Sequence, residues 1–489
     1  MSAAPLPATP APKFTQGSTL RHVVVMTATG SIGLMAIFLV DFLNLFYIAL
    51  LGQAELAAAI GYAGTLLFFT VSLSIGISIS GTALVSRALG ARRRDEARRL
   101  ATSSLVFMTA VTLVLTLATL PLLSPILTLF GATGRTHEIA WRFLLIVMPT
   151  TPLMGLGMAC AGLLRAVGDA KRAMYVTLSG GLITAVFDPL LIFGFGLGVD
   201  GAAITSIFAR LGLIAIGFNG CVRIHNLLAR PNVRAAIADA RPLSGIAVPA
   251  VLANIATPFG NAIVTAAVAR YGDSAVAGYA VIGRIIPLAF GAIFALAGSI
   301  GPILGQNLGA ERYDRVRRAL LDGMTFTTVY CIAMCLVLVV LRESIVKVFG
   351  ATGEGAELIR FFCIYIAPSW IVVGWLFVAN AGFNNLGFPT WSTVFNWGRA
   401  TVGTIPFVYF GATQFGAAGV LAGQALGAVA FGVGAAVVCF MVVGKLGARR
   451  TSSSRDEIPV TAPPTPPFSS GKAATAIDWT DSHNDVKRP

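Results

Sequence analysis

The chain alternates between long apolar stretches and short polar segments. Apolar runs of about 20 residues are long enough to cross the hydrocarbon core of a bilayer as helices. About twelve such runs can be distinguished. Their approximate limits are 23–48, 56–86, 100–123, 138–163, 173–194, 199–222, 244–270, 276–305, 318–341, 358–383, 392–412 and 416–444. This pattern predicts an all-α polytopic membrane protein.

The second half of the chain repeats the first at an offset of 219 residues. Leu-Gly-Ala at 89–91 recurs at 308–310, and Phe-Gly-Ala-Thr-Gly at 130–134 recurs at 349–353. Matches at one offset in an apolar chain are typical of transporters built from repeats. Each half has about six runs, an even number, so both halves enter the membrane in the same orientation. We therefore expect two pseudo-symmetric six-helix lobes with a cavity between them.

The amino-acid composition also predicts where the lobes end and the terminal tails begin. Its two ends are rich in Pro, Ala, Ser and Thr, which predicts disordered tails. The first apolar run lacks a small-residue cleavage site and is too long for a signal peptide, so we expect it to be retained. The expected parts are an N-terminal tail at 1–17, a first lobe at 18–222, a cytoplasmic linker at 223–243, a second lobe at 244–445 and a C-terminal tail at 446–489.

Charge sets the orientation. The chain is 56% hydrophobic and only 11% charged, with a net charge of +14 and a pI of about 10.0. Soluble domains are about 25% charged. The arginines gather in the loops after the second, fourth, sixth and eighth runs, which all lie on one side. By the positive-inside rule that side, with both termini, is cytoplasmic. We expect a bacterial inner-membrane protein and no nucleic-acid partner.

Signals for enzymatic chemistry are absent from the sequence. The four histidines lie at or beyond the ends of the runs, and the six cysteines are scattered without a CxxC pair. There is no HExxH, GxSxG or GxxxxGK[ST] motif. The sequence therefore predicts neither an enzyme nor ATP-driven transport by this chain, and no resident cofactor or metal.

Two acidic residues lie deep in apolar runs, Asp41 and Asp188. A carboxylate at the middle of a bilayer costs about 2.5–3.5 kcal/mol on insertion scales and usually marks an ion pathway. Thr184, one helical turn before Asp188, and Ser206, on the next run, offer hydroxyl oxygens. The aligned positions of the second half carry no carboxylate. We expect a cation-coupling site in the first lobe alone.

The second lobe offers polar side chains instead. Asn254, Thr257 and Asn261 share one helical face, and Asn380 and Asn384 are one turn apart. Such residues can line a substrate cavity or join helices by hydrogen bonds. The full set of candidate cavity residues is Asn44, Asn254, Thr257, Asn261, Asn380 and Asn384. Three arginines lie in or near the runs, Arg210, Arg284 and Arg399, and we expect them to extend to an interface or to bind helix C-termini.

The chain resembles the multidrug and toxic compound extrusion (MATE) family over about residues 20–445. The resemblance rests on an ordered set of segments rather than on one motif. These are Val40-Asp41 with Leu51-Gly52, Gly-Thr-Ala-Leu-Val-Ser-Arg-Ala-Leu-Gly-Ala at 81–91, Leu-Arg-Ala-Val-Gly-Asp-Ala-Lys at 164–171, Asp188-Pro189 with Gly-Val-Asp-Gly-Ala-Ala at 198–203, and Gly-Gln-Asn-Leu-Gly-Ala at 305–310.

The resemblance implies a V-shaped pair of six-helix bundles that work by alternating access. It implies export of amphipathic, often cationic compounds in exchange for H⁺ or Na⁺. In the DinF-like branch, Asp41 and Asp188 match the cation-coupling aspartates. That branch usually has Asn where this chain has Thr184 and Thr where it has Ser206. The hydroxyls keep transient Na⁺ binding at Asp41 and Asp188 open, whereas loss of the amide favours H⁺.

Two alternatives remain at this stage. The wider superfamily includes flippases of lipid-linked precursors, but the candidate cavity residues are mostly Asn, Thr and apolar rather than the cationic set that pyrophosphate needs. A non-transporting receptor or scaffold is disfavoured because the chain lacks a sizeable domain outside the membrane. The expected partners are the lipid bilayer and small organic, cationic substrates, and we expect a monomer.

Overall fold

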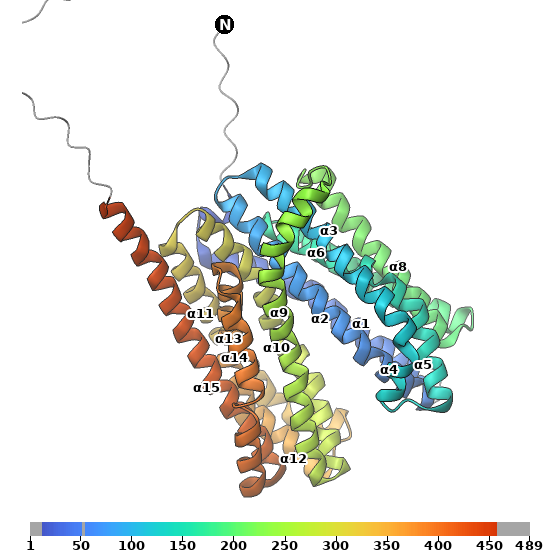
Figure 1. Ribbon diagram of the computed structural model, residues 1–489. Coiled ribbons are helices and arrows are strands. Elements are labelled where there is room, and N and C mark those ends of the chain that lie inside the picture. Colours follow the sequence, from blue (N-terminus) through green and yellow to red (C-terminus); the bar gives the residue numbers. More distant parts are fainter. Residues whose placement is uncertain (1–11, 51–53, 457–489) are drawn as a thin grey trace, which may run out of the picture. The chain divides into compact units, whose positions relative to one another are not determined.

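The structure is a computed structural model that describes residues 12–50 and 54–456; at 41–46, 48–50, 54, 57 and 449–456 it describes the backbone alone. All regular structure in this part of the chain is helical (Figure 1). The α-helices are α1 (Thr19–Leu50), α2 (Ala54–Gly90), α3 (Arg94–Thr119), α4 (Leu123–Leu129), α5 (Gly134–Val147), α6 (Thr151–Ala166), α7 (Ala170–Pro189), α8 (Gly198–Asn219), α9 (Val233–Val268), α10 (Asp273–Gly309), α11 (Tyr313–Val348), α12 (Gly353–Phe361), α13 (Trp370–Leu386), α14 (Pro389–Ala400) and α15 (Ile405–Asp456).

Several membrane crossings are built from two helices joined at a proline. Pro121 lies in the turn between α3 and α4, Pro149 in the turn between α5 and α6, and Pro368 in the turn between α12 and α13. Proline has no backbone N–H and cannot continue the hydrogen-bond ladder of a helix. Each crossing therefore bends at the proline without leaving the membrane. The two helices of such a crossing share one uninterrupted apolar run in the sequence.

The described chain contains 11 helical segments that are long and apolar enough to span a membrane. The last, Pro389–Ala448, is 60 residues long and folds back at Phe415 and Gly416, whose backbone is not helical. A methyl group on Gly427 would lie 1.5 Å from the carbonyl oxygen of Gly403, so the two arms touch along glycines. This segment crosses twice, which confirms the predicted twelve crossings, and its glycines let the two arms pack closely.

The repeat seen in the sequence is also a repeat of backbone geometry. Gly168 and Gly387 have φ of 85° and 95°, and each ends a helix in the left-handed region that glycine adopts without strain. The non-glycine residues Arg92 and Glu311, which are 219 apart, have φ of 59° and 56°. A non-glycine residue with positive φ is uncommon. Its recurrence at the same offset supports duplication of the fold, not only of short motifs.

Each half of the described chain has its own apolar core. One cluster of buried residues draws only on 264–421, and another only on 59–203. A third, at 77–247, is built almost wholly by the first half, with Ala247 of α9 as its contribution from the second. The two halves are therefore two lobes, as predicted, and they meet where α1 and α2 pack against α10 and where α2 packs against α9.

The lobes are in close contact at the ends of α2 and α10. This is the arginine-rich end, defined by the loops at 90–94, 166–170, 224–233 and 309–313. A methyl group on Gly90 would lie 2.1 Å from the carbonyl oxygen of Gln306, and one on Gly309 would lie 2.0 Å from that of Arg87. Gly90 and Gly309 are repeat partners, as are Arg87 and Gln306. The contact is thus pseudo-symmetric and depends on the absence of side chains at both glycines.

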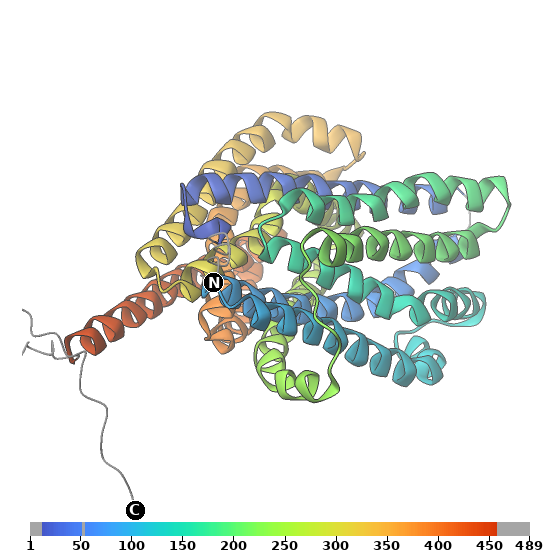
Figure 2. The ribbon, with the colours of Figure 1, turned by 90° about the horizontal axis from the view of Figure 1, so that it is seen from above.

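The first described residues join the two lobes at this end. Residues 13–16, which we call the N-terminal strap, include a short 3-10 helix whose Phe14 is 1% exposed. The Phe14 amide donates to Gln306 Oε1 (3.0 Å) of the second lobe, and Lys13 Nζ donates to the Gly168 carbonyl (2.6 Å) of the first. Figure 2 shows the dark-blue start of the chain against the yellow helices of the second lobe.

Three predicted boundaries are wrong. Residues 12–17 are not disordered, because Phe14 is buried and Arg315 donates to its carbonyl. The connection between the lobes is only 225–232, because Asn232 caps α9 by accepting from the Ala235 amide, which starts the helix at Val233. Helix α15 continues to Asp456, so residues 446–456 are helical rather than part of a disordered tail. The remainder of both tails lies outside the described residues.

Candidate functional site

Asp188 is the central residue of the predicted cation-coupling site. It is 1% exposed at the last turn of α7, inside the span Ala170–Gly194. The Thr205 hydroxyl of α8 lies near the carboxyl, although it donates to the Gly201 carbonyl (3.1 Å), and Oδ1 has no partner among the described atoms. A buried acceptor without a partner is costly unless a proton or cation satisfies it. The geometry therefore leaves one carboxylate oxygen available to a proton or a cation.

The backbone around Asp188 explains why its carboxylate faces α8. Pro189 follows it and removes the N–H that would bond to the carbonyl four residues earlier. The chain then forms a π-helical turn, Leu190–Gly194, which lies against the first turn of α8. A methyl group on Gly201 would be 2.8 Å from the Leu191 carbonyl carbon. This glycine thus lets α8 approach closely enough for Thr205 to reach Asp188.

The two predicted hydroxyl neighbours are placed differently. Thr184 Oγ1 donates to the Gly180 carbonyl (3.0 Å), and Ser206 Oγ donates to the Ala202 carbonyl (3.1 Å). Among the described hydrogen bonds, neither hydroxyl reaches Asp188. The Thr205 hydroxyl also donates within α8, to the Gly201 carbonyl (3.1 Å), but it is the one near the Asp188 carboxyl, because Thr205 lies one turn beyond Gly201 on the face of α8 that meets the π-helical turn. That helical phase was the signal in the sequence that could have identified it.

The side chains of Asp41 and Asn44 lie outside the described residues, but their backbone is part of α1. Gly33 of α1 faces Thr177 of α7, and Gly181 of α7 faces Val40 of α1, so the two helices run parallel. Extending this register puts positions 44–47 level with Asp188. The backbone of Asp41 is then about 5–9 Å nearer the arginine-rich end, at 1.5 Å per residue. The pairing of the two carboxylates stays a prediction.

The polar face of α9 meets polar partners from two other helices. Thr257 Oγ1 accepts from Arg399 Nη2 (3.0 Å) of α14, and Asn261 Oδ1 accepts from Gln424 Nε2 (3.5 Å) of α15. Asn254 instead donates to the Ala250 carbonyl of its own helix (2.8 Å). The structure therefore brings Thr257 and Asn261 into one polar group and leaves Asn254 out of it.

The asparagines of α13 lie close to the lobe contact. Asn384 is 4% exposed, and its carbonyl accepts from Arg87 Nη2 (3.2 Å) across the lobes. The amide oxygens of Asn380 and Asn384 are buried and have no partner among the described atoms. Asn384 therefore lies in the closed arginine-rich end, whereas the sequence suggested an open cavity. A cavity role for Asn380 stays a prediction.

The three arginines behave in different ways. Arg210 is buried and donates to the Val147 carbonyl (2.6 Å) at the end of α5, which confirms the predicted binding to a helix C-terminus. Arg284 is exposed on α10. Arg399 does not extend to an interface but turns toward Thr257 within the second lobe. Since Arg399 lies in the last turn of α14, the expected interaction with a helix C-terminus stays a prediction.

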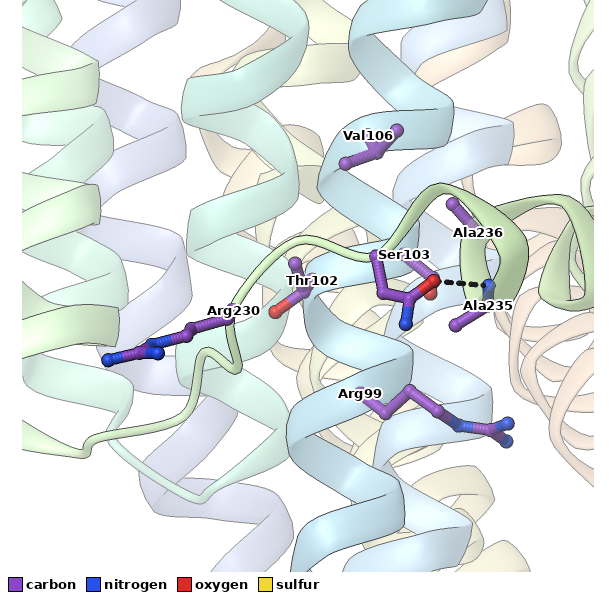
Figure 3. Close-up of a pocket in the computed structure, with 8 residues that line it drawn as sticks. Arg99, Thr102, Ser103, Val106, Arg230, Ala235 and Ala236 are labelled. Atoms are coloured by element: carbon purple, nitrogen blue, oxygen red, sulfur yellow. Dashed lines mark hydrogen bonds between the residues drawn. The ribbon is translucent and has the colours of Figure 1, made fainter.

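A shallow pocket lies at the arginine-rich end, between α3 and the connection from α8 to α9 (Figure 3). Its lining includes Arg99 and Thr102 of α3 and Arg230 and Asn232 of the connection. Thr102 accepts from the Ala229 amide (2.8 Å), so the pocket is the seam along which the connection is fixed to α3. None of the candidate coupling or cavity residues lines it.

The same end holds an ion-pair group that fixes the start of α7. Asp169 accepts from the Arg172 amide (3.1 Å) and from His225 Nε2 (2.8 Å), and pairs with the Arg172 guanidinium. Burial alone raises the pKa of the Asp169 carboxyl, but hydrogen bonds from His225 and Arg172 outweigh it, so the pKa lies below its usual range. Asp169 should therefore be ionised in the folded protein near neutral pH.

We expect Asp169→Asn to lower the free energy of unfolding by about 1 kcal/mol near neutral pH, because asparagine can still cap α7 but loses the ion pair with Arg172 and the charge that accepts from His225. Because the carboxyl pKa is lower in the folded state, the stabilisation is complete above the unfolded value of about 4. It is lost as pH falls from there through the folded pKa. Denaturation in detergent at several pH values measures this. A difference from wild type that does not shrink below about pH 4 contradicts it, and Asp95→Asn is the control.

The described fold defines a class: a polytopic helical membrane transporter made of two parallel repeats. The sequence model of the MatE family matches residues 31–190 and 249–410, which is more than half of the chain. The chain belongs to the MatE family, whose members are membrane transporters and not enzymes. This confirms the resemblance at the level of the family, and the DinF-like branch stays a prediction.

Curated relatives and solved structures agree with this assignment. The FAD transporter of Shewanella oneidensis is 26% identical, over 82% of this chain and 90% of the relative. The multidrug export protein MepA of Staphylococcus aureus is 25% identical, over 71% and 77%. The Vibrio cholerae MATE transporter VcmN in its bent form superposes with a TM-score of 0.82 at 22% identity, over 88% of this chain and 98% of that one. At this identity the structural likeness shows the fold.

Proposed function

We propose that this protein is a cation-coupled antiporter that exports amphipathic organic compounds by alternating access. One observation carries the proposal: Asp188 is buried within a membrane span and keeps one carboxylate oxygen without a partner in the described structure. Multidrug export by relatives such as MepA supports the substrate class. Family membership favours this function over a flippase or a scaffold.

The proposed cycle uses the contact between the lobes. The described arrangement is closed where Gly90 and Gly309 touch the opposite lobe, and Arg87 donates to the Asn385 carbonyl (2.7 Å) across it. Substrate enters when this end opens to the cytoplasm. A cation arriving from the other side then occupies Asp188, with Asp41 as its expected second carboxylate, and substrate leaves. Exporting a unit positive charge against 100 mV costs about 2.3 kcal/mol, so the coupling cation must supply this.

We favour H⁺ as the coupling ion, with Na⁺ as the alternative. A proton needs only the free Oδ1 of Asp188, whereas a metal cation needs several oxygen ligands. The hydroxyls of Thr184, Ser206 and Thr205 all donate to carbonyls of their own helices, so no described hydrogen bond gathers a set of hydroxyl oxygens around the carboxylate. The proposed setting is the bacterial inner membrane, with both termini in the cytoplasm and the protein acting as a monomer.

Dye efflux from proteoliposomes tests the proposal. Purified protein is reconstituted with ethidium inside, and an inward pH gradient is compared with an inward Na⁺ gradient at the same membrane potential. We expect the pH gradient to drive efflux. Efflux driven only by Na⁺ would reverse the choice of ion. Equal efflux with and without either gradient would reject antiport.

Substitutions around Asp188 test the site itself. Thr205→Val keeps the shape of the side chain and removes the hydroxyl, and we expect gradient-driven efflux to fall several-fold because the Asp188 carboxyl loses a neighbouring hydroxyl worth about 1 kcal/mol. Ser206→Ala, on the neighbouring position, should change efflux by less than about two-fold. A larger effect at Ser206 than at Thr205 would restore the original assignment of the hydroxyl.

A further inference from the structure

Arg399 lies about half-way along its membrane crossing and forms no ion pair among the described residues. It is ten residues into α14, which begins at Pro389 at the arginine-rich end. At 1.5 Å per residue this is about 15 Å, half the thickness of the hydrocarbon core. The ranges 240–272, 274–310, 323–342 and 358–444 contain no Asp or Glu, so the second lobe offers no carboxylate at this depth. A charged side chain in such a place is costly and usually functional.

The Arg399 guanidinium is held by one hydrogen bond, and some of its N–H donors have no acceptor among the described atoms. Its Nη2 donates to Thr257 Oγ1 (3.0 Å), while its Nε is buried and has no partner among the described atoms. The pair stands open on one side, and Thr257 is exposed. An arginine has five N–H donors in a fixed fork that matches the oxygens of a carboxylate or a phosphate. Arg399 is therefore held in place by one neutral contact and keeps donors available.

Further polar side chains stand beside this pair. Asn261 accepts from Gln424 (3.5 Å), one turn along α9 from Thr257, and Gln424 is also the hydrogen-bond partner of Tyr279. Together Arg399, Thr257, Asn261, Gln424 and Tyr279 form what we call the Arg399 cluster, with members from α9, α10, α14 and α15. Four helices thus bring hydrogen-bonding groups to one positive charge, as a polar binding site requires.

We propose that the Arg399 cluster binds an anionic group, a carboxylate or a phosphate, of the transported compound. This deepens the proposed function and rests on it. Lipid headgroups carry the same chemistry, but a depth of about 15 Å puts the cluster far from them. Arg399 also repels cations, so a positive group on the same substrate has to lie toward Asp188. We thus expect amphipathic acids and zwitterions as substrates in addition to the cationic compounds expected earlier.

Binding of three probes with one aromatic body tests the proposal. Naphthoate, naphthyl phosphate and naphthylmethylammonium are titrated by calorimetry into the purified full chain in nanodiscs of zwitterionic lipid. We expect at least one of the two anions to bind about ten-fold more tightly than the cation, and the two anions to distinguish carboxylate from phosphate. Arg399→Gln should weaken binding of that anion by about 10- to 100-fold, the worth of a charge-assisted hydrogen bond, and should not weaken binding of the cation.

Two further variants separate the effect of the Arg399 charge from a general effect of losing an arginine. Arg399→Lys should recover part of the preference because it retains the charge, and Arg284→Gln, an exposed arginine of the same lobe, should bind like wild type. If Arg399→Gln does not fold, Arg399→Lys and Thr257→Val carry the comparison. A wild-type protein that binds the cation as tightly as both anions, or that binds neither anion, overturns the proposal, as does an unchanged preference in Arg399→Gln.

These outcomes are separate from those of antiport. The titration involves no gradient, so loss of ion coupling cannot produce or hide the preference for an anion. Conversely, an anion preference that depends on Arg399 together with ethidium efflux that ignores both gradients would reject the antiporter and keep the binding site.

Discussion

Replacing Asp188 with Asn is expected to abolish gradient-driven transport while leaving the helical fold intact. Asparagine has nearly the same shape, so the contact with Thr205 survives, but it cannot take up a proton or balance a cation. Because Asp188 is the buried carboxylate on which the coupling rests, we expect the gradient-driven rate to fall at least about 100-fold, which corresponds to about 2.7 kcal/mol. Efflux from proteoliposomes, driven by a pH gradient, measures this.

The control is Glu138→Gln, which removes an exposed carboxyl from α5 of the same lobe and should leave the rate unchanged. Thermal unfolding in detergent shows whether each variant is folded. If folded Asp188→Asn protein still transports at the wild-type rate under a gradient, coupling does not use Asp188 and the site lies elsewhere.

Gly309→Ala is expected to open the arginine-rich end. The new methyl group would meet the Arg87 carbonyl oxygen at 2.0 Å, where non-bonded atoms need about 3.5 Å. Both atoms belong to backbone, so no side chain can rotate away and the lobes have to separate. Overpacking costs about 1–3 kcal/mol, which shifts an equilibrium by about 5- to 150-fold. The cores of the two lobes do not include this contact, so each lobe should remain folded.

Labelling of a buried thiol measures the opening. Ser86→Cys puts a thiol in this contact, where a methyl group on Gly305 would be 2.8 Å from Ser86 Cβ. A hydrophilic maleimide should label it at least about ten-fold faster in Gly309→Ala than in the parent. Gly90→Ala, the repeat partner, should act alike, whereas Gly283→Ala, which has no atom within 4 Å of the added methyl group, should not. Equal labelling in all three variants would mean that this contact does not hold the lobes closed.

Most of the fold could be predicted from the sequence because lipid leaves few alternatives. A segment that spans the membrane has to be a long apolar helix, so the hydropathy of the sequence predicts its length and position. The duplication was readable because glycines such as Gly168 and Gly387 are needed wherever the backbone enters the left-handed region. The N-terminal strap was not readable, because its order depends on one buried residue, Phe14, and on partners almost 300 positions away.

The candidate site was predicted in part. Asp188 could be identified because an acidic residue in an apolar run is rare. The sequence pointed to Ser206, whereas Thr205 is the hydroxyl nearer the Asp188 carboxyl, since hydroxyl chemistry alone does not say which side of a helix faces the carboxyl. Arg399 was expected at an interface or at a helix C-terminus, and its contact with Thr257 could not be read from the sequence. In both cases the missing information was geometric, namely rotation about a helix and depth along it.

The N-terminal strap also has a consequence for the order of assembly. Lys13 and Phe14 are synthesised early, whereas Gln306 and Arg315, which hold the strap, are synthesised about 300 residues later. At about 5–20 residues per second, this is a delay of some 15–60 seconds. During that time the first lobe inserts and packs, while the strap has only half of its binding surface. Docking of the oldest residues can therefore occur only after the second lobe has reached α11, which makes it a late step in the maturation of the transporter.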